Sequence, residues 1–419
     1  PRSGVAGNDV TTMNPTVDVY FEKTLSEAST LMADVTATSY SNDQSAFTSE
    51  PGFFEDILDL NTQKNSVIGE LLYSYAKENR TFSAGYRGSF GSLRSDLSGG
   101  SVTNVRTGRQ RLYGEYSSSH GPFSYRVSLG AENNIKAGDD GFSRFAFSPT
   151  LLFSYKLNKR NRLRLRLDSE TAMPDIQQMS GNRILIMENF YRRGSADVHN
   201  STGYRSRLIY SYNIPRKLIV QTDAHYNRTA GFLYDAFVQD GGAWYLETRN
   251  AHHFSEAGMN MVVTYLPWKW LQLDVDFSAD RQAIRETASG ETYSDWFFPV
   301  YLNASAVWGD WSLSCRQTFG GKMLDGLYRK GLEKVSYLSL TYDWKNWRFG
   351  AQCLFPFQDD KFSNETAAIA PVSHVTRTNL RTKNREFGIT VSWFFQRGRK
   401  NYSAKSLENS DVDSGVFRF

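Results

Sequence analysis

Apolar and polar residues alternate over many segments of this chain. In residues 161–170, leucines alternate with charged side chains, in the order Arg162, Leu163, Arg164, Leu165, Arg166, Leu167 and Asp168. Because successive side chains of a strand point to opposite faces, this period of two places the leucines on one face and the charges on the other. The same alternation recurs at residues 123–129, 218–226, 271–278, 336–342 and 387–395. The pattern predicts an all-β fold made of amphipathic strands.

The connections between these segments alternate in length. Tight turns are expected at residues 77–81, 119–122, 158–161, 214–217, 267–269, 309–310 and 345–346, and longer polar stretches at 93–106, 172–200, 281–291 and 358–382. The strands span about 9 to 13 residues, which suits a tilted membrane-crossing strand better than a soluble one. Short turns at one end and long loops at the other are typical of outer-membrane barrels. We therefore expect a transmembrane antiparallel β-barrel rather than a soluble sandwich.

The positions of the tryptophans independently indicate a membrane protein. Six of the nine tryptophans flank three successive short turns, namely Trp268, Trp270, Trp308, Trp311, Trp344 and Trp347. Indole rings concentrate at membrane–water interfaces, where an apolar body and an N–H donor are both accommodated. These residues indicate one interface of a membrane barrel.

The pattern predicts about 17 strands: two before Ser41, fourteen between residues 65 and 357, and a last one at 385–396. A short periplasmic turn is expected at 24–28, a long external loop at 41–63, and a hairpin beyond the membrane at 231–250. Bacterial single-chain barrels have even strand numbers, so the N-terminal end of the barrel is expected to be incomplete. We expect a barrel over residues 1–396 and a C-terminal periplasmic tail over 397–419.

Composition narrows the class further. The 48 Lys and Arg against 44 Asp and Glu leave a net charge of +4, too small to indicate a nucleic-acid partner. Two cysteines exclude a disulfide framework. A mean hydropathy of −0.50 and the lack of any long apolar stretch exclude membrane-spanning helices. The chain begins at Pro1 without a basic and then apolar leader, which indicates a mature product or a fragment.

No catalytic or metal-binding motif is apparent. The six histidines form no His-x-His or His-x-x-x-His pair, and there is no nucleophile elbow or phosphate-binding loop. Cys315 and Cys353 fall on the apolar register of strands that have one strand between them, a separation of roughly 10 Å that exceeds disulfide reach. We expect a protein that is not an enzyme, with no metal and no cofactor, and two lipid-facing cysteines.

The polar faces of the strands carry charges of both signs. The candidates for lining the lumen are Arg162, Arg164, Arg166, Asp168, Arg205, Arg207, Asp274 and Asp276, with Arg109, Arg111, Glu115, Asp223, His225 and Asp280 on the same kind of face. Charged residues cannot face lipid at mid-depth without costing roughly 2 to 4 kcal/mol for Arg or Lys. Something aqueous or polar therefore passes through or sits within the barrel; for any single residue, salt-bridging between strands or contact with a plug is an alternative to a substrate pathway.

Two short segments resemble a known family. Residues 169–182, with Gly181-Asn182-Arg183-Ile184-Leu185 in place of a Gly-Asn-Pro-x-Leu motif, are similar to an external loop of TonB-dependent outer-membrane receptors. The tail at 398–402 and 407–415 resembles the C-terminal ends of Bacteroidota barrels of this class. The spacing of strands and turns from about Thr16 onward is similar to that of the same receptors. The resemblance implies a Gram-negative outer membrane, a 22-stranded barrel, an N-terminal plug domain that this chain lacks, and coupling to the TonB energy-transducing complex. A surface lipoprotein is a further possible partner besides the membrane lipid.

Three functional hypotheses follow. The first is an active importer of a nutrient such as a glycan, peptide, siderophore or cofactor, whose external loops capture it with aromatic and polar side chains: Tyr191, Arg192, Arg193, Tyr234, Trp244 and Tyr245. The second is a passive porin of 16 to 18 strands, with residues 172–200 folded inward as a constricting loop. The third, an outer-membrane enzyme, would have to rely on Asp274 and Asp276, which share a face but have no adjacent His or Ser partner.

Overall fold

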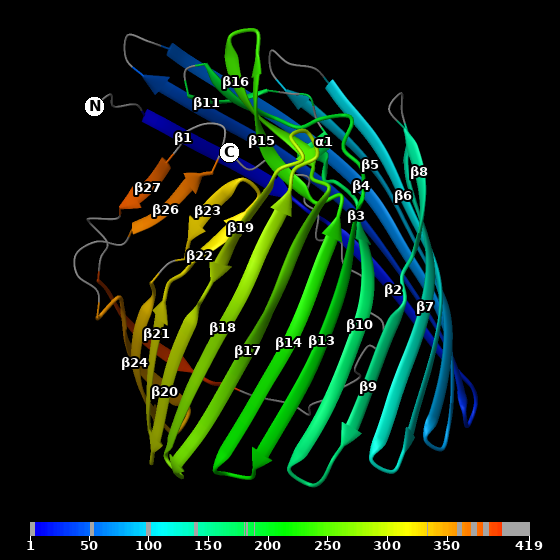
Figure 1. Ribbon diagram of the computed structural model, residues 1–419, viewed down its shortest axis with the longest axis vertical. Coiled ribbons are helices and arrows are strands. Elements are labelled where there is room, and N and C mark those ends of the chain that lie inside the picture. The colour runs from blue at the N-terminus through cyan, green and yellow to red at the C-terminus, as the bar shows by residue number, and fades with distance from the viewer. Residues whose placement is uncertain are drawn as a thin grey trace.

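A single antiparallel sheet forms the wall of the protein (Figure 1). The computed structural model describes residues 5–50, 54–97, 102–137, 141–179, 181, 183–187, 189–332, 334–357, 363–369, 375–379 and 385–395. In these residues the wall consists of 20 strand segments: β1 (Val5–Met13), β2 (Thr16–Ser26), β3 (Ser29–Glu50), β4 (Phe54–Lys77), β5 (Arg80–Leu97), β6 (Val102–His120), β7 (Phe123–Ala137), β8 (Phe142–Phe147), β9 (Thr150–Lys156), β10 (Asn161–Ala172), β13 (Ser201–Ile214), β14 (Leu218–Ala230), β17 (His253–Trp268), β18 (Leu271–Arg285), β19 (Thr292–Phe297), β20 (Val300–Trp308), β21 (Trp311–Phe319), β24 (Ser336–Trp344), β25 (Trp347–Leu354) and β28 (Glu386–Trp393).

Three pairs of these segments are single strands interrupted by a proline. β1 and β2 both pair with β3, β8 and β9 with β7, and β19 and β20 with β18. The breaks contain Pro15, Pro149 and Pro299, and proline has no N–H to give to the ladder. Each proline carbonyl still accepts a backbone hydrogen bond from a neighbouring strand, at 3.1 Å in all three cases. With each interrupted pair counted as one strand, the 20 segments fill 17 positions, which confirms the predicted strand number for the described residues.

The wall follows the order of the sequence, each strand pairing with the next. It curves so that β1, β2 and β3 pass behind β13–β18 in Figure 1. Within the described residues, β28 pairs only with β25, and β1 and β2 pair only with β3. Both faces of β2 and of β28 are accordingly exposed along nearly their whole length.

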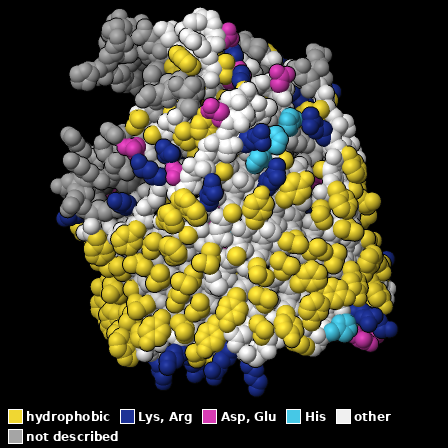
Figure 2. All heavy atoms as spheres, in the orientation of Figure 1, with side chains coloured by type: hydrophobic (Ala, Val, Ile, Leu, Met, Phe, Trp, Pro, Cys, Tyr) yellow, Lys and Arg dark blue, Asp and Glu magenta, His cyan; other side chains and the backbone are white. Residues whose placement is uncertain are grey.

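On the face shown in Figure 2, apolar side chains form a broad belt over the outer surface of the wall. They come from alternate positions of the strands, such as Leu112 on β6, Leu129 on β7 and Met259 on β17, which are exposed by 64%, 52% and 50%. Such an exposed apolar area on a folded protein indicates a surface that contacts lipid. No helix in the described residues is long and apolar enough to cross a membrane.

The seven predicted tight turns are confirmed, as is the turn at 24–28, which joins β2 to β3. Glu78, Arg216, Lys345, Gly121 and Gly309 adopt positive φ angles in five of these turns. The six predicted interfacial tryptophans lie beside three of them at the ends of β17, β18, β20, β21, β24 and β25. All six are at least 39% exposed, and Trp268 stacks on Trp270 with ring centroids 5.3 Å apart.

Two predicted external loops are instead strand extensions. β3 and β4 run for 22 and 24 residues and pair through most of the segment 41–63, so the expectation of a loop there is wrong. The polar stretch 93–106 likewise contains the paired ends of β5 and β6. Beyond the bilayer both faces of a strand can be wet, so Ser, Thr and Asn replace the apolar register and the alternation disappears from the sequence.

Two small sheets and a short helix lie at the external end of the wall. The first sheet contains β11 (Ile184–Met187), β12 (Phe190–Arg193), β16 (Ala243–Asn250) and β15 (Leu233–Asp240), and the second contains β22 (Lys322–Asp325), β23 (Tyr328–Gly331), β26 (Ser363–Ala368) and β27 (Val375–Asn379). The helix is α1 (Ile176–Met179). The β15–β16 hairpin confirms the predicted extension at 231–250. The proposed tail at 397–419 lies outside the described residues.

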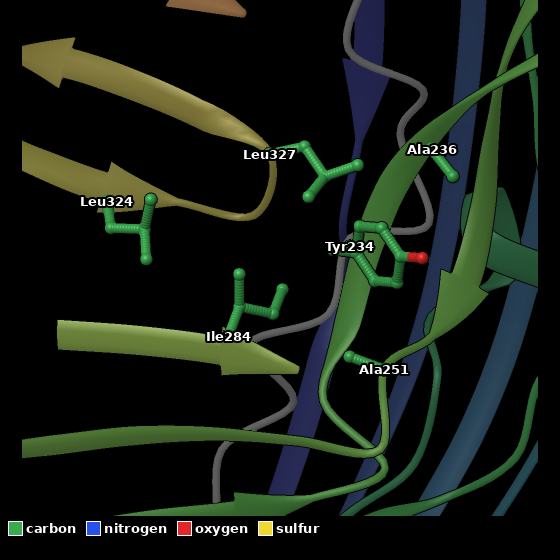
Figure 3. Close-up of a cluster of buried hydrophobic side chains, with 6 residues drawn as sticks. All are labelled: Tyr234, Ala236, Ala251, Ile284, Leu324 and Leu327. Carbon is green, nitrogen blue, oxygen red and sulfur yellow. The ribbon is translucent and has the colours of Figure 1, made fainter. Parts of the chain in front are cut away.

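A buried apolar cluster joins these loops to the wall. Figure 3 shows Ile284, at the end of β18, directed toward Leu324 and Leu327 of the second small sheet and its turn and toward Tyr234 of β15. Ile284 has no exposed surface and the two leucines are 2% exposed. Burying one such side chain stabilises a fold by about 1.5 to 3 kcal/mol, so the external segments form a packed layer. We call the two small sheets together with this cluster the external layer.

Candidate functional site

The inner face of the wall, opposite the apolar belt, carries a ladder of ion pairs. The Asp168 side chain on β10 is only 5% exposed and accepts bonds from the guanidinium of Arg166 at 2.7 Å and from that of Arg205 on β13 at 2.5 Å. Arg205 also reaches Glu170 at 2.8 Å. The strand register places Asp168 directly opposite Arg205, so the pair follows from strand alignment. One carboxylate therefore holds two cations on neighbouring strands.

The ladder continues onto the next three strands. Arg207 donates to Asp223 on β14 at 3.0 Å. His225 lies between carboxylates, with Nδ1 3.2 Å from Asp223 and Nε2 3.1 Å from Asp280 and 3.5 Å from Glu256. Charged groups thus connect β10, β13, β14, β17 and β18 across the inner face, several of them nearly removed from solvent. Buried charges in such numbers persist because each faces a partner.

The remaining lumen candidates lie on the same inner face. Arg164 donates to Gln221 at 3.2 Å, Asp274 accepts from Thr264 at 2.6 Å, and Asp276 accepts from Asn260 at 2.6 Å. Arg162 is exposed at the end of β10 near the short turn. All eight candidates thus share one face, whereas a role for them in a substrate path stays a prediction. Glu256, Asn260 and Gln221 complete the network and were not singled out from the sequence.

The external-loop candidates pack against one another in the external layer. The rings of Tyr191 and Tyr245 stack at 5.6 Å, and the Arg193 guanidinium lies 4.2 Å from the Tyr245 ring centroid and 2.5 Å from Glu247. Arg192 pairs with Asp235 at 3.2 Å. These contacts build the layer itself.

Two of these aromatic candidates expose little surface. Tyr234 is 5% exposed and donates to Glu286 at 3.0 Å, and burial raises the pKa of its phenol. Tyr245 is 7% exposed, while Trp244 is partly buried against the cluster of Phe190, Phe237 and Leu246. Burial also raises the pKa of the neighbouring Tyr328 to about 12. Ligand contact by these residues stays a prediction, with Arg192 and Trp244 more accessible than Tyr234 and Tyr245.

A cavity of about 610 Å³ lies between the inner faces of β4, β5 and β6 and the segment 173–179. The segment crosses from the end of β10, and Met179 of α1 packs on Leu93 and Val105 of the opposite wall. Asp175 begins α1 by accepting the amide of Gln178 at 2.8 Å while its own amide donates to the Gln178 side chain at 2.9 Å. Residues 173–179 thus fold inward.

The lining of the cavity combines basic and apolar residues. Four cations from the wall, Lys64, Arg87, Arg109 and Arg111, and two carboxylates, Glu170 and Asp175, line it together with Ile68, Leu93, Val105, Met173, Pro174 and Met179. Arg109 pairs with the buried Glu132 at 2.7 Å, and Arg87 lies 3.8 Å from Glu70. Arg111 lies over the Tyr113 ring at 5.5 Å, and its Nε is buried without a hydrogen-bond partner. The arrangement suits a ligand that has an anionic group and an apolar part.

Sequence reasoning noted Arg109 and Arg111 but missed Lys64, Arg87 and Met179. The available signal was the dense run Arg106-Thr-Gly-Arg-Gln-Arg111, in which two arginines share a face. The porin hypothesis anticipated an inward fold of residues 172–200, but the sequence did not indicate which part of the wall α1 would contact.

The structure also locates the two cysteines and the groups that could bind a metal ion. Cys315 and Cys353 are free thiols in register with Leu338 of the strand between them, as predicted, although Cys353 is only 9% exposed. Among the described residues no group of three or more His, Cys, Asp and Glu side chains is arranged to hold a metal ion.

The long tilted strands, the lipid-facing belt and the polar inner face define an outer-membrane β-barrel protein of Gram-negative bacteria. Residues 22–393 match the outer membrane protein beta-barrel family, and the chain belongs to that family. No curated protein shows significant sequence similarity to the chain.

The solved structures that this chain resembles include transporters and receptors. The copper transporter OprC matches with a TM-score of 0.70 at 10% identity, over 91% of this chain and 65% of that one. The ferric-catecholate import receptor Fiu from E. coli K12 matches with a TM-score of 0.62 at 12% identity, over 93% and 64%. The ferric yersiniabactin uptake receptor FyuA from Yersinia pestis matches with a TM-score of 0.63 at 11% identity, over 92% and 62%. This chain thus spans slightly less than two thirds of each, and identities this low show the fold alone.

Proposed function

We propose that this protein forms the barrel of an active outer-membrane importer of the TonB-dependent receptor type. The cavity beneath α1 carries the proposal, because it is an inner-wall site that joins basic and apolar surfaces at the external side of the barrel. The barrel resemblance to OprC, Fiu and FyuA supports it. A plug domain inside the wall and coupling to the TonB complex are part of this proposal.

The proposed substrate is a nutrient with an anionic group and an apolar portion. Peptides, ferric siderophores and anionic cofactors have this chemistry, whereas neutral glycans do not. Two of the four cations, Arg109 and Arg87, are paired with Glu132 and Glu70 of the wall, so the donor that supports anion binding most directly is the buried Nε of Arg111, which has no hydrogen-bond partner. Guanidinium groups bind carboxylates and phosphates through paired hydrogen bonds.

Uptake by cells tests this function. A strain that carries the gene is compared with a deletion strain for accumulation of labelled ferric chelates, anionic peptides and neutral oligosaccharides, with and without a protonophore. Active import predicts gene-dependent accumulation of an anionic substrate above its external concentration, abolished by the protonophore. Equilibration that the protonophore leaves unchanged would contradict active import.

The cavity itself is tested by Arg111→Met, with Arg126→Met as the matched control. Arg126 also faces inward, pairs with Glu115 at 3.4 Å and does not line the cavity. Uptake of the anionic substrate should fall about tenfold or more in the first variant and little in the second, since loss of a charged hydrogen bond costs about 1.5 to 3 kcal/mol. Equal uptake by both variants would exclude a role for the cavity.

A passive porin is the second candidate, because residues 173–179 fold inward as part of a constricting loop would. Planar-bilayer recording separates the two functions. A stable, ion-selective conductance that changes when Asp175 and Glu170 are replaced by Asn and Gln would favour the porin.

A further inference from the structure

A basic patch lies on the outer surface of the wall directly above the apolar belt. It consists of Arg228 on β14, His253 on β17, and Arg281 and Arg285 on β18. His253 is directly opposite Arg285, and Ala230, two residues beyond Arg228, is opposite His253. All four share the outward register of Met259 and Val275, and Figure 2 shows basic and His side chains gathered above the belt in this region.

On the described outer face of β13, β14, β17, β18 and β19, no carboxylate balances these charges. The outward positions of β13, β14, β17, β18 and β19 hold no Asp or Glu; the carboxylates of these strands belong to the alternate, inward set. In the described residues, no ion pair involves Arg228, Arg281 or Arg285. Burial and the neighbouring Arg228, His252 and Arg285 lower the pKa of His253, as expected where positive potential accumulates.

The height of the patch matches the headgroup region of the outer leaflet. Arg228 and Arg281 are each ten residues from the periplasmic starts of their strands, Leu218 and Leu271. At about 3.3 Å per residue and a tilt of about 40°, ten residues rise about 25 Å, which equals the height of the apolar band of an outer-membrane barrel. His253 and Arg285 lie about 10 to 13 Å higher by the same geometry. The patch therefore begins where the hydrocarbon ends.

The aromatic residues beside the basic patch also indicate that it lies at the height of the lipid headgroups. Tyr204, Tyr226 and Trp296 flank the patch on the outer face and are exposed by 53%, 48% and 54%. Tyrosine and tryptophan concentrate at the interface, where lipid phosphates also lie. The side chains of the patch point away from the lumen, toward the lipid around the protein.

We propose that this patch is a binding site for the phosphate group of an outer-leaflet lipid. Three guanidiniums without a salt-bridge partner, on β14 and on β18 with β17 between them, supply several N–H donors to one phosphate, or to two on the same headgroup, which a phosphorylated glycolipid presents. The site anchors this sector of the barrel at a defined height and rotation. It is independent of what the lumen transports.

Native mass spectrometry of the purified barrel in detergent tests the site, with diphosphoryl lipid A, monophosphoryl lipid A and phosphatidylcholine as probes. The triple variant Arg228→Gln, Arg281→Gln, Arg285→Gln removes the patch. The control, Lys159→Gln, Arg160→Gln, Lys217→Gln, removes three charges at the periplasmic turns 158–161 and 214–217. We expect retention of diphosphoryl lipid A to weaken on the order of 10- to 100-fold in the patch variant only, since each basic residue contributes about fivefold near an anionic surface.

Three outcomes would overturn the proposal. Equal weakening in both triple variants would show general charge attraction. Equal retention of phosphatidylcholine and lipid A by the wild-type protein would show that the phosphorylated headgroup is not recognised. Displacement of lipid A by millimolar inorganic phosphate, with the same dependence on the three arginines, would identify a site for free anions. Heat-modifiable migration on gels establishes that each variant is folded before binding is compared.

Discussion

Asp168 offers the most direct test of the ladder on the inner wall. Asp168→Asn keeps the shape of the side chain but removes the charge that holds Arg166 and Arg205. Breaking a fully buried pair costs about 3 to 5 kcal/mol. The two arginine side chains are 53% and 48% exposed, so solvent compensates them in part, and we expect a loss of about 1 to 3 kcal/mol in unfolding free energy.

The same cluster contains its own control. Glu170 also pairs with Arg205, at 2.8 Å, but its side chain is 60% exposed. Glu170→Gln should therefore change stability by no more than about 0.5 kcal/mol. The two substitutions remove the same charge from neighbouring positions of β10, so their difference isolates the effect of burial.

The assay is reversible urea unfolding of the barrel in phospholipid vesicles, followed by tryptophan fluorescence. A double-mutant cycle of Asp168→Asn with Arg205→Gln should give a coupling energy of about 1 kcal/mol or more. Equal stability of the two single variants, or a coupling energy below about 0.3 kcal/mol, would show that the ladder does not hold the wall together.

Three further predictions concern other parts of the wall. Leu165→Arg should destabilise the barrel by about 2 to 4 kcal/mol in the same assay, because Leu165 is on the lipid face at mid-strand; an unchanged midpoint would contradict that placement. Gly258→Ala should cost about 1 to 3 kcal/mol, because a Cβ there would lie 2.6 Å from the carbonyl oxygen of Ala279, whereas Gly69→Ala meets nothing closer than 3.9 Å and should be neutral. His253 should titrate below its usual pKa in NMR spectra. Because the folded state disfavours the protonated imidazole, the unfolding free energy should be constant above about pH 6.5 and fall as the pH drops toward the lowered pKa. A raised pKa of His253 would refute the charge arrangement around it.

The sequence alone was sufficient to predict the strands of the barrel wall. A period of two, seven tight turns and clustered tryptophans predicted a membrane barrel with 17 strands, and the structure has that arrangement in its described residues. These signals survive because lipid imposes the same requirement on every strand: an apolar outward residue must alternate with an inward one. The prediction failed where this requirement ends, at the polar extensions of β3 and β4 beyond the bilayer.

Tertiary structure decided which residues meet. The sequence showed that Asp168, Arg205, Asp223 and His225 face inward, but the strand register alone sets their partners. Tyr234 and Tyr245 look like free loop aromatics in sequence, yet contacts between segments far apart in the chain bury them. The cavity beneath α1 and the basic patch have the same origin, because each combines residues from several strands. Alternation specifies the face of a residue, whereas strand register and loop packing specify its neighbours.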